Sequence, residues 1–177
     1  MNEWIILIVL SFIAGCTVKY ADFLEDSVKS RKAIRIFFGV LYGCTLFMGT
    51  YLFPLITTLW IGVILGLLLI GKIDGPAHYT GVGTFFILGF SIGFSSVSWT
   101  LLLIYVIANI IEEIVNEYTD KHKIKQKWVQ KITQSRPILE LTVLTVAIST
   151  GIWIPWIALF SFDIGYILIT RYEMEAT

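Results

Sequence analysis

Two stretches of the sequence carry carboxylates at a spacing that suits metal binding. Asp22 and Asp26 lie four residues apart, and Glu113 and Glu117 repeat this spacing. Side chains four residues apart share one face of a helix, and carboxylates are ordinary ligands of Mg²⁺ and Mn²⁺. We therefore predict that these residues hold a divalent cation, which neutralises the oxygens of a bound phosphate. For Asp22 and Asp26, the alternative is a solvated helix of mixed charge.

A short segment over residues 71–78, Gly-Lys-Ile-Asp-Gly-Pro-Ala-His, adds groups for acid–base chemistry. We predict that His78 and Asp74 are catalytic, because an imidazole exchanges a proton near neutral pH. The alternative for His78 is a loop histidine with an ordinary hydrogen-bonding role. Lys72 and Lys19 are predicted to bind an anionic part of the substrate, with Arg136 as a further candidate. Snorkelling of the two lysines to a membrane surface is the alternative.

Polar side chains also interrupt apolar stretches, where an isolated charge in lipid is costly. Asn109 and Glu112 precede Glu113 in one such stretch, and Asp163 and Tyr166 lie on one helical face in another. We predict that Asn109, Glu112, Asp163 and Tyr166 contact the substrate inside a cavity. For Asp163, a structural hydrogen bond or ion pair is the alternative.

The elements that must position these residues are membrane helices. Of the 177 residues, 56% are hydrophobic and 15% are charged, against about 25% charged in an ordinary soluble domain. Mean hydropathy is +0.81. The composition excludes a disordered chain, and a formal net charge of zero gives no basic surface for nucleic acid. We predict about seven short transmembrane helices, because seven apolar runs approach the length that spans a bilayer: 4–18, 36–53, 55–70, 82–95, 99–115, 138–153 and 156–170. Several of these runs are short, so a re-entrant hairpin in place of two crossings is the alternative.

The positions of the cations predict the orientation of this helix bundle. Every Lys and Arg follows the first, third, fifth or seventh run, so the N-terminus is expected outside and the C-terminus inside. We predict one integral domain over residues 1–177 in the cell membrane, with cytoplasmic loops at 19–35 and 117–137. In the second loop, Ile124, Trp128 and Ile132 recur every four residues. They predict an interfacial amphipathic helix, or else a solvated basic loop.

Glycine pairs at four-residue spacing occur in three successive runs. Such pairs let helix backbones approach closely. We expect them to pack helices within one bundle, and a homo-oligomer formed through these faces is the alternative. The pairs are Gly39 with Gly43, Gly62 with Gly66, and Gly89 with Gly93.

The acidic spacing resembles that of one enzyme family. Asn109, Glu113 and Glu117 resemble the acidic motif of the intramembrane prenyltransferases of the UbiA superfamily, and Asp22 with Asp26 stands in the place of the second motif. The resemblance implies transfer of a prenyl group within the membrane. The chain departs from that family in using Glu for Asp, in the order of the two motifs and in being far shorter.

The polar residues together predict an acidic cavity that opens toward the cytoplasm. We predict a divalent-metal-dependent enzyme acting on a lipid or isoprenoid that bears phosphate or diphosphate, with membrane lipids as its partners. One alternative is a transporter or channel coupled to protons or cations, in which carboxylates at mid-membrane carry the ion. Another is a small scaffold subunit. Polar residues largely stop near the middle of the runs, which favours the enzyme.

Overall fold

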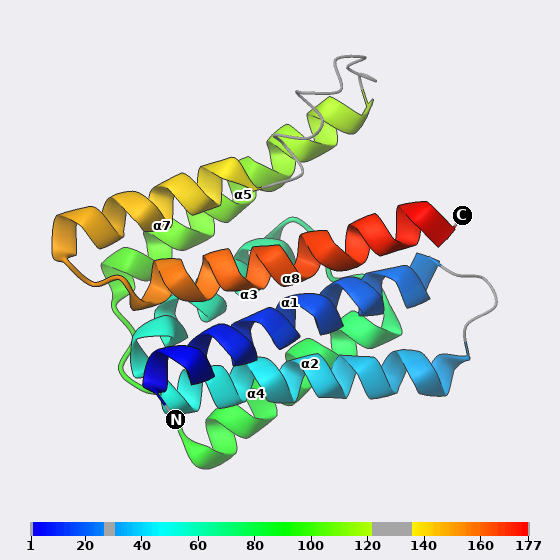
Figure 1. Ribbon diagram of the computed structural model, residues 1–177, viewed down its shortest axis with the longest axis horizontal. Coiled ribbons are helices and arrows are strands. Elements are labelled where there is room, and N and C mark those ends of the chain that lie inside the picture. The colour runs from blue at the N-terminus through cyan, green and yellow to red at the C-terminus, as the bar shows by residue number, and fades with distance from the viewer. Residues whose placement is uncertain (1, 27–30, 122–135, 177) are drawn as a thin grey trace.

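The chain folds into a bundle of helices (Figure 1). The computed structural model describes residues 2–26, 31–121 and 136–176, and over these residues it contains seven α-helices, one 3-10 helix and no strand. The predicted all-α fold is therefore confirmed. The predicted interfacial helix around Trp128 lies outside the described residues. The helices are α1 (Glu3–Asp26), α2 (Lys32–Leu52), η1 (Pro54–Ile56), α3 (Thr57–Leu69), α4 (Pro76–Ile92), α5 (Trp99–Lys121), α7 (Pro137–Thr150) and α8 (Ile154–Ala176).

The helices differ in whether they are long enough to cross a membrane. Among the described residues, four are long and apolar enough to do so: Glu3–Asp26, Lys32–Leu52, Trp99–Thr119 and Ile154–Tyr172. Helices α3, α4 and α7 are shorter, with 13, 17 and 14 residues. At 1.5 Å per residue, α3 is about 20 Å long, which is less than the roughly 30 Å of a hydrocarbon core.

Two helices continue beyond the apolar runs into the predicted loops. Helix α1 passes Val18 and ends at Asp26, and α5 passes Val115 and ends at Lys121. The predicted loops at 19–35 and 117–137 are therefore shorter than expected. An apolar run marks the buried length of a helix, whereas Lys, Glu and Tyr also form helix once it has been started. As a result, Asp22 is carried on a helix.

Each of the four prolines lies in the first turn of a helix. Pro54 starts η1, Pro76 starts α4, Pro137 starts α7, and Pro155 is the second residue of α8. Proline suits this position because its fixed φ is helical and its missing N–H would have no partner inside the helix. The prolines thus set where the short helices start.

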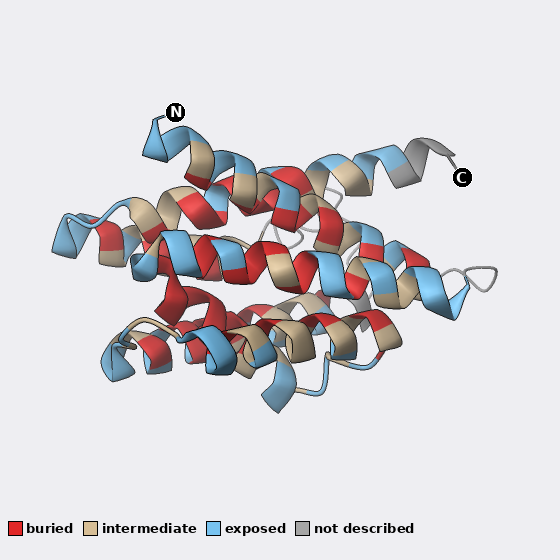
Figure 2. Ribbon diagram, turned by 90° about the horizontal axis from the view of Figure 1, so that it is seen from below, coloured by how far each residue is buried: buried red, intermediate tan, exposed pale blue. Residues whose placement is uncertain are grey.

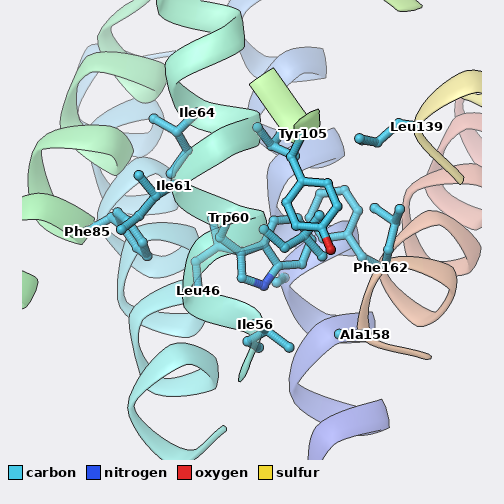
Figure 3. Packing of buried hydrophobic residues seen from close by; sticks show 14 of the residues in the cluster. Leu46, Ile56, Trp60, Ile61, Ile64, Phe85, Tyr105, Leu139, Ala158 and Phe162 are labelled. Carbon is cyan, nitrogen blue, oxygen red and sulfur yellow. The ribbon is translucent and has the colours of Figure 1, made fainter. Parts of the chain in front are cut away.

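Helix α3 occupies the centre of the bundle. Nine of its 13 residues are buried, as expected for a helix that is apolar all round. The ring of Trp60 lies 4.9 Å from that of Phe162 on α8, and Tyr105 of α5 packs nearby (Figure 3). The surrounding helices turn exposed residues outward (Figure 2). Helix α1 packs against α8 and α2, and α2 packs against α4. On the other side, α5 packs against α3 and α7, and α7 also contacts α8.

Glycines bring α1 and α8 into backbone contact. A Cβ atom on Gly15 of α1 would overlap the carbonyl oxygen of Phe162 in α8. In the other direction, a Cβ atom on Gly165 of α8 would overlap the carbonyl oxygen of Phe12 in α1. Only residues without a side chain permit this approach. The two helices are therefore held at short range where residues 12–16 meet residues 162–165.

Two of the three predicted glycine pairs also pack helices within the chain. Gly39 and Gly43 on α2 lie against the backbone of α4, and Gly62 and Gly66 on α3 lie against α5. In the third pair, Gly93 ends α4 with a φ of 119°. The expected packing within one bundle therefore holds for the first two pairs. The homo-oligomer stays a prediction.

We predict that Gly15→Ala lowers the free energy of unfolding by about 1–3 kcal/mol, the usual cost of forcing extra volume into a packed contact. Gly83→Ala is the matched control, because an added Cβ at this α4 residue meets nothing within 4 Å. The control should be neutral or stabilising by about 0.5–1 kcal/mol through helix propensity. Denaturant midpoints in detergent measure both, and equal losses would contradict the close contact.

Candidate functional site

A cavity of about 190 Å³ lies beside the C-terminal half of α3. Helices α1, α2, α3, α4, α5 and α8 contribute to its wall, together with the loop after α3 and the residue before α7. Trp60, Ile64 and Phe162 belong to the apolar part of the wall. The polar lining residues are Asp22, Tyr42, Lys72, His78, Glu113, Arg136 and Tyr166.

Asp22 joins three helices at this cavity. Its Oδ1 lies 3.1 Å from Nε2 of His78 on α4, and its Oδ2 accepts a 2.8 Å hydrogen bond from the Tyr166 hydroxyl on α8. A carboxylate with a donor at each oxygen fixes the orientation of both donors. The structure thus brings together three residues that the sequence predicted for three different roles: metal binding, catalysis and substrate binding.

His78 lies in the first turn of α4, ahead of the predicted apolar run 82–95. The hydroxyl of Tyr42 donates a 3.0 Å hydrogen bond to the backbone carbonyl of His78 and thereby ties α2 to this turn. Burial would lower the pKa of His78, but the hydrogen bond and negative charge of Asp22, with the charges of Glu25 and Asp74, outweigh it. The pKa is raised above its ordinary value of 6.5.

Two cations lie over the ring of Tyr166. Arg136 Cζ is 5.0 Å and Lys19 Nζ is 5.3 Å from the ring centroid, which is within the range of cation–π attraction. Arg136 also lines the cavity, as does Lys72 from the loop after α3, whereas Lys19 does not. The guanidinium fork of Arg136 matches the geometry of phosphate oxygens. The cavity therefore offers positive charge beside the Asp22–His78 pair.

The structure separates the members of each predicted carboxylate pair. Asp22 and Glu113 line the cavity, whereas Asp26 and Glu117 are exposed and do not line it. Asp74 is also exposed outside the lining. Among the described residues, no group of three or more His, Cys, Asp or Glu side chains is arranged to hold a metal ion. The divalent cation stays a prediction, and it rests on one carboxylate from each pair.

Two glutamates bind the first N–H groups of helices that begin inside the bundle. Glu25 of α1 accepts a hydrogen bond of 2.5 Å from the N–H of Ala77 in α4. Glu112 of α5 accepts bonds of 2.6 and 2.9 Å from the N–H groups of Ile138 and Leu139 in α7. A carboxylate here satisfies N–H groups that have no partner within their own helix. Glu112, predicted to contact substrate, is instead placed as a helix cap outside the cavity lining.

Two other predicted substrate residues lie away from the cavity. Asn109 is 1% exposed, and its Nδ2 donates a 3.1 Å hydrogen bond to the carbonyl of Val63, which joins α5 to α3. Asp163 lines a separate groove between α7 and α8, together with Glu140. Helical spacing showed that Asn109 and Asp163 each share a helix face with other polar residues. It did not show which cavity that face would line.

Sequence reasoning missed two residues that hold the site together. Tyr42 supports the first turn of α4, but it lies in an apolar run where nothing in its spacing marks it. Glu25 caps α4, but in the sequence it stands among other charges between Asp22 and Lys29. The sequence indicates this role only through Pro76, which predicts a helix start far downstream. The first N–H groups of that helix need a hydrogen-bond acceptor from another part of the chain.

Known proteins add no further assignment. No protein-family model matches this chain, and no curated protein or solved structure matches it. The resemblance to the UbiA superfamily is thus one of residue spacing, and Asn109 and Glu117 do not line the cavity. Over the described residues, the fold is a helical bundle with a cavity of mixed polar and apolar lining beside its short central helix.

We predict that the His78 imidazole titrates above the ordinary histidine value of 6.5, because Asp22 favours its protonated form. NMR titration measures this in a His122→Gln background, which leaves one histidine in the chain. Asp22→Asn should move the titration to lower pH, whereas Asp26→Asn on the exposed side of α1 should not. If the pH at which His78 titrates is the same in the Asp22→Asn variant, the pairing of Asp22 with His78 is contradicted.

We predict that Glu112→Ala lowers the free energy of unfolding by about 1–3 kcal/mol, because two buried N–H groups lose their acceptor. Glu112→Gln keeps one acceptor oxygen and should cost less. The control is Glu117→Ala on the exposed face of the same helix. Denaturant unfolding in detergent gives the comparison, and a Glu112→Ala protein as stable as the Glu117→Ala protein would refute the capping role.

Proposed function

We propose that this is a multi-pass protein of the cell membrane. The support lies in large apolar side chains that face outward, such as Phe90 at 79%, Trp99 at 76% and Leu69 at 71% exposure. Soluble proteins rarely expose large contiguous apolar patches, whereas lipid solvates such side chains. With the N-terminus outside, Lys72 and Arg136 belong to the cytoplasmic end, which the positive-inside rule favours. The cavity then opens at the inner leaflet.

We further propose that the cavity is the active site of an enzyme acting on a lipid or isoprenoid that bears phosphate or diphosphate. The observation that carries this proposal is the convergence of Asp22, His78, Arg136 and Lys72 on one cavity. A hydrogen-bonded imidazole and carboxylate suit proton transfer, and the two cations suit a phosphate. The apolar wall beside them suits the first carbons of an alkyl or prenyl chain.

The geometry suggests a role for each polar group. Asp22 holds Nε2 of His78 and so leaves Nδ1 to exchange a proton with a substrate hydroxyl or a water molecule. Arg136 and Lys72 bind phosphate oxygens and stabilise the charge that develops as the phosphate bond breaks. Tyr166 holds Asp22 from the other side. In this proposal, Asp22 and Tyr166 orient the imidazole of His78. Arg136 and Lys72 orient the phosphate of the substrate.

The proposed enzyme uses a divalent cation that the protein and the substrate bind together. Mg²⁺ is commonly bound by one or two carboxylates together with the phosphates of the substrate. Asp22 and Glu113 supply carboxylates from α1 and α5 to one cavity, and a bound diphosphate would supply the remaining oxygen ligands. On this proposal, Mg²⁺ binds tightly only when a phosphate is present.

The distribution of polarity favours an enzyme over a transporter. The cavity lies beside the C-terminal half of α3, and an apolar cluster that includes Trp60, Tyr105 and Phe162 packs around the same helix (Figure 3). A transporter needs a polar path that continues toward the other face. A buried aromatic core in that place suits a pocket that opens to one side.

We predict that purified protein in nanodiscs releases phosphate or diphosphate from phosphatidate or from geranylgeranyl diphosphate. Turnover should require Mg²⁺ and stop on addition of EDTA. His78→Gln should lower kcat by about 10²-fold or more, the usual contribution of a general acid–base group. Asp22→Asn and Glu113→Gln should lower turnover to a similar extent, since each removes a carboxylate from the cavity.

The chain offers matched controls one helical turn away. Asp26→Asn and Glu117→Gln remove the same charge from the same helices, but at exposed positions outside the cavity. Both variants should retain the turnover of the wild type. No release from either substrate class by folded wild-type protein would count against the enzyme, and equal losses in the control variants would count against this cavity.

A further inference from the structure

A second hollow lies between α7 and α8, which run in opposite directions along the bundle (Figure 1). We call it the α7–α8 groove. Its volume is about 400 Å³, which is within the range of pockets that take small molecules. Leu141, Phe160 and Ile164 line the groove and are exposed on the outside of the bundle. A ligand can therefore reach the groove from outside, without passing through the cavity at Asp22.

Two acidic side chains interrupt the apolar lining of the α7–α8 groove: Glu140 of α7 and Asp163 of α8. Asp163 is 6% exposed, and its Oδ2 is buried without a hydrogen-bond partner among the described residues. A buried carboxylate oxygen needs a donor, because it has lost its hydrogen bonds to water. Among the described residues that line the groove, none is Lys or Arg. A bound molecule can supply the missing donor.

Two aromatic residues precede Asp163 on α8 and line the same groove. They are Trp156 and Phe160, whose ring centroids lie 5.4 Å apart. The faces of aromatic rings attract organic cations, and Trp does so most strongly. A lining of acids and aromatic rings complements an organic ammonium group, whereas a phosphate would be repelled by the acids.

The depth of Asp163 favours an organic cation over a metal ion. Asp163 stands at the middle of Ile154–Tyr172, which has 19 residues and is long and apolar enough to cross a membrane. A small divalent ion gives up its water reluctantly, whereas an amine with an apolar body dissolves in lipid. Among the residues that the structure describes, no group of three or more His, Cys, Asp or Glu is arranged to hold a metal.

We propose that the α7–α8 groove binds an amphiphilic amine. Its ammonium group donates hydrogen bonds to Asp163 and Glu140, and its apolar body lies against Leu141, Phe160 and Ile164. An ammonium group has three donors and no acceptor, so it satisfies the buried oxygen of Asp163. The amine enters from the surrounding lipid. The groove shares no lining residue with the proposed active site, so this proposal does not depend on the enzyme.

Calorimetric titration of the full-length protein in detergent tests whether the charge is recognised. The probes are octylamine, which is protonated at pH 7, and octanol, which has the same alkyl chain without the charge. Titration into protein-free micelles gives the background. Octylamine should bind saturably, and octanol about tenfold or more weakly, as expected for loss of one hydrogen bond between charged groups. Equal binding of both probes, or no saturable binding of octylamine by folded protein, would overturn the proposal.

Substitutions test whether the groove is the site. Glu140→Gln/Asp163→Asn should weaken octylamine binding by about tenfold or more. Asp163→Asn alone serves if the double variant does not fold, as judged by circular dichroism. Glu113→Gln is the matched control, because it removes a carboxylate from the cavity instead, and it should bind octylamine as the wild type does. Binding that survives in the groove variant, or that Glu113→Gln weakens as much, would overturn the proposal.

Discussion

A helix that begins inside an apolar bundle leaves its first N–H groups without water, and this constraint shapes one end of the molecule. In α4 and α7, proline removes one of these N–H groups, and Glu25 and Glu112 accept hydrogen bonds from the next. Because each glutamate sits on a different helix, each cap fixes the start of one helix against the side of another. His78 and Arg136 lie beside these capped starts, so the bonds that complete the backbone also position the cavity's imidazole and guanidinium.

The short central helix explains why there is a cavity at all. Helix α3 ends at Leu69, and the chain then turns at Gly71 with a φ of 70°. The longer helices around it continue, so the space past its last turns is lined by their polar ends. Asp22, His78 and Tyr166 fill part of that space by bonding to one another. A buried polar network is stable only when its members are satisfied in this way.

The sequence predicted the helices better than the site. Apolar runs located the seven α-helices of the described residues, because burial along a helix needs apolar residues, and prolines mark the starts of α4, α7 and α8. Helical spacing also placed Asp22, His78, Glu113 and Tyr166 among the candidates, and these line one cavity. Spacing could not tell that Asp26 faces outward, because which face of a helix is buried depends on its neighbours. The roles of Glu25 and Glu112 were hidden for the same reason, since their partners lie 52 and 26 residues away.

The contact between α1 and α8 also decides when the site can form during synthesis. Asp22 and Tyr166 are 144 residues apart in the chain, and the ribosome delivers α1, α2 and α4 long before α8. Until α8 arrives, Asp22 lacks one donor and the cavity lacks one wall. The reciprocal packing at Gly15 and Gly165 then acts as a closing step. A nascent chain stalled before α8 would carry the imidazole and the carboxylate, but it would have no enclosed chamber in which to use them.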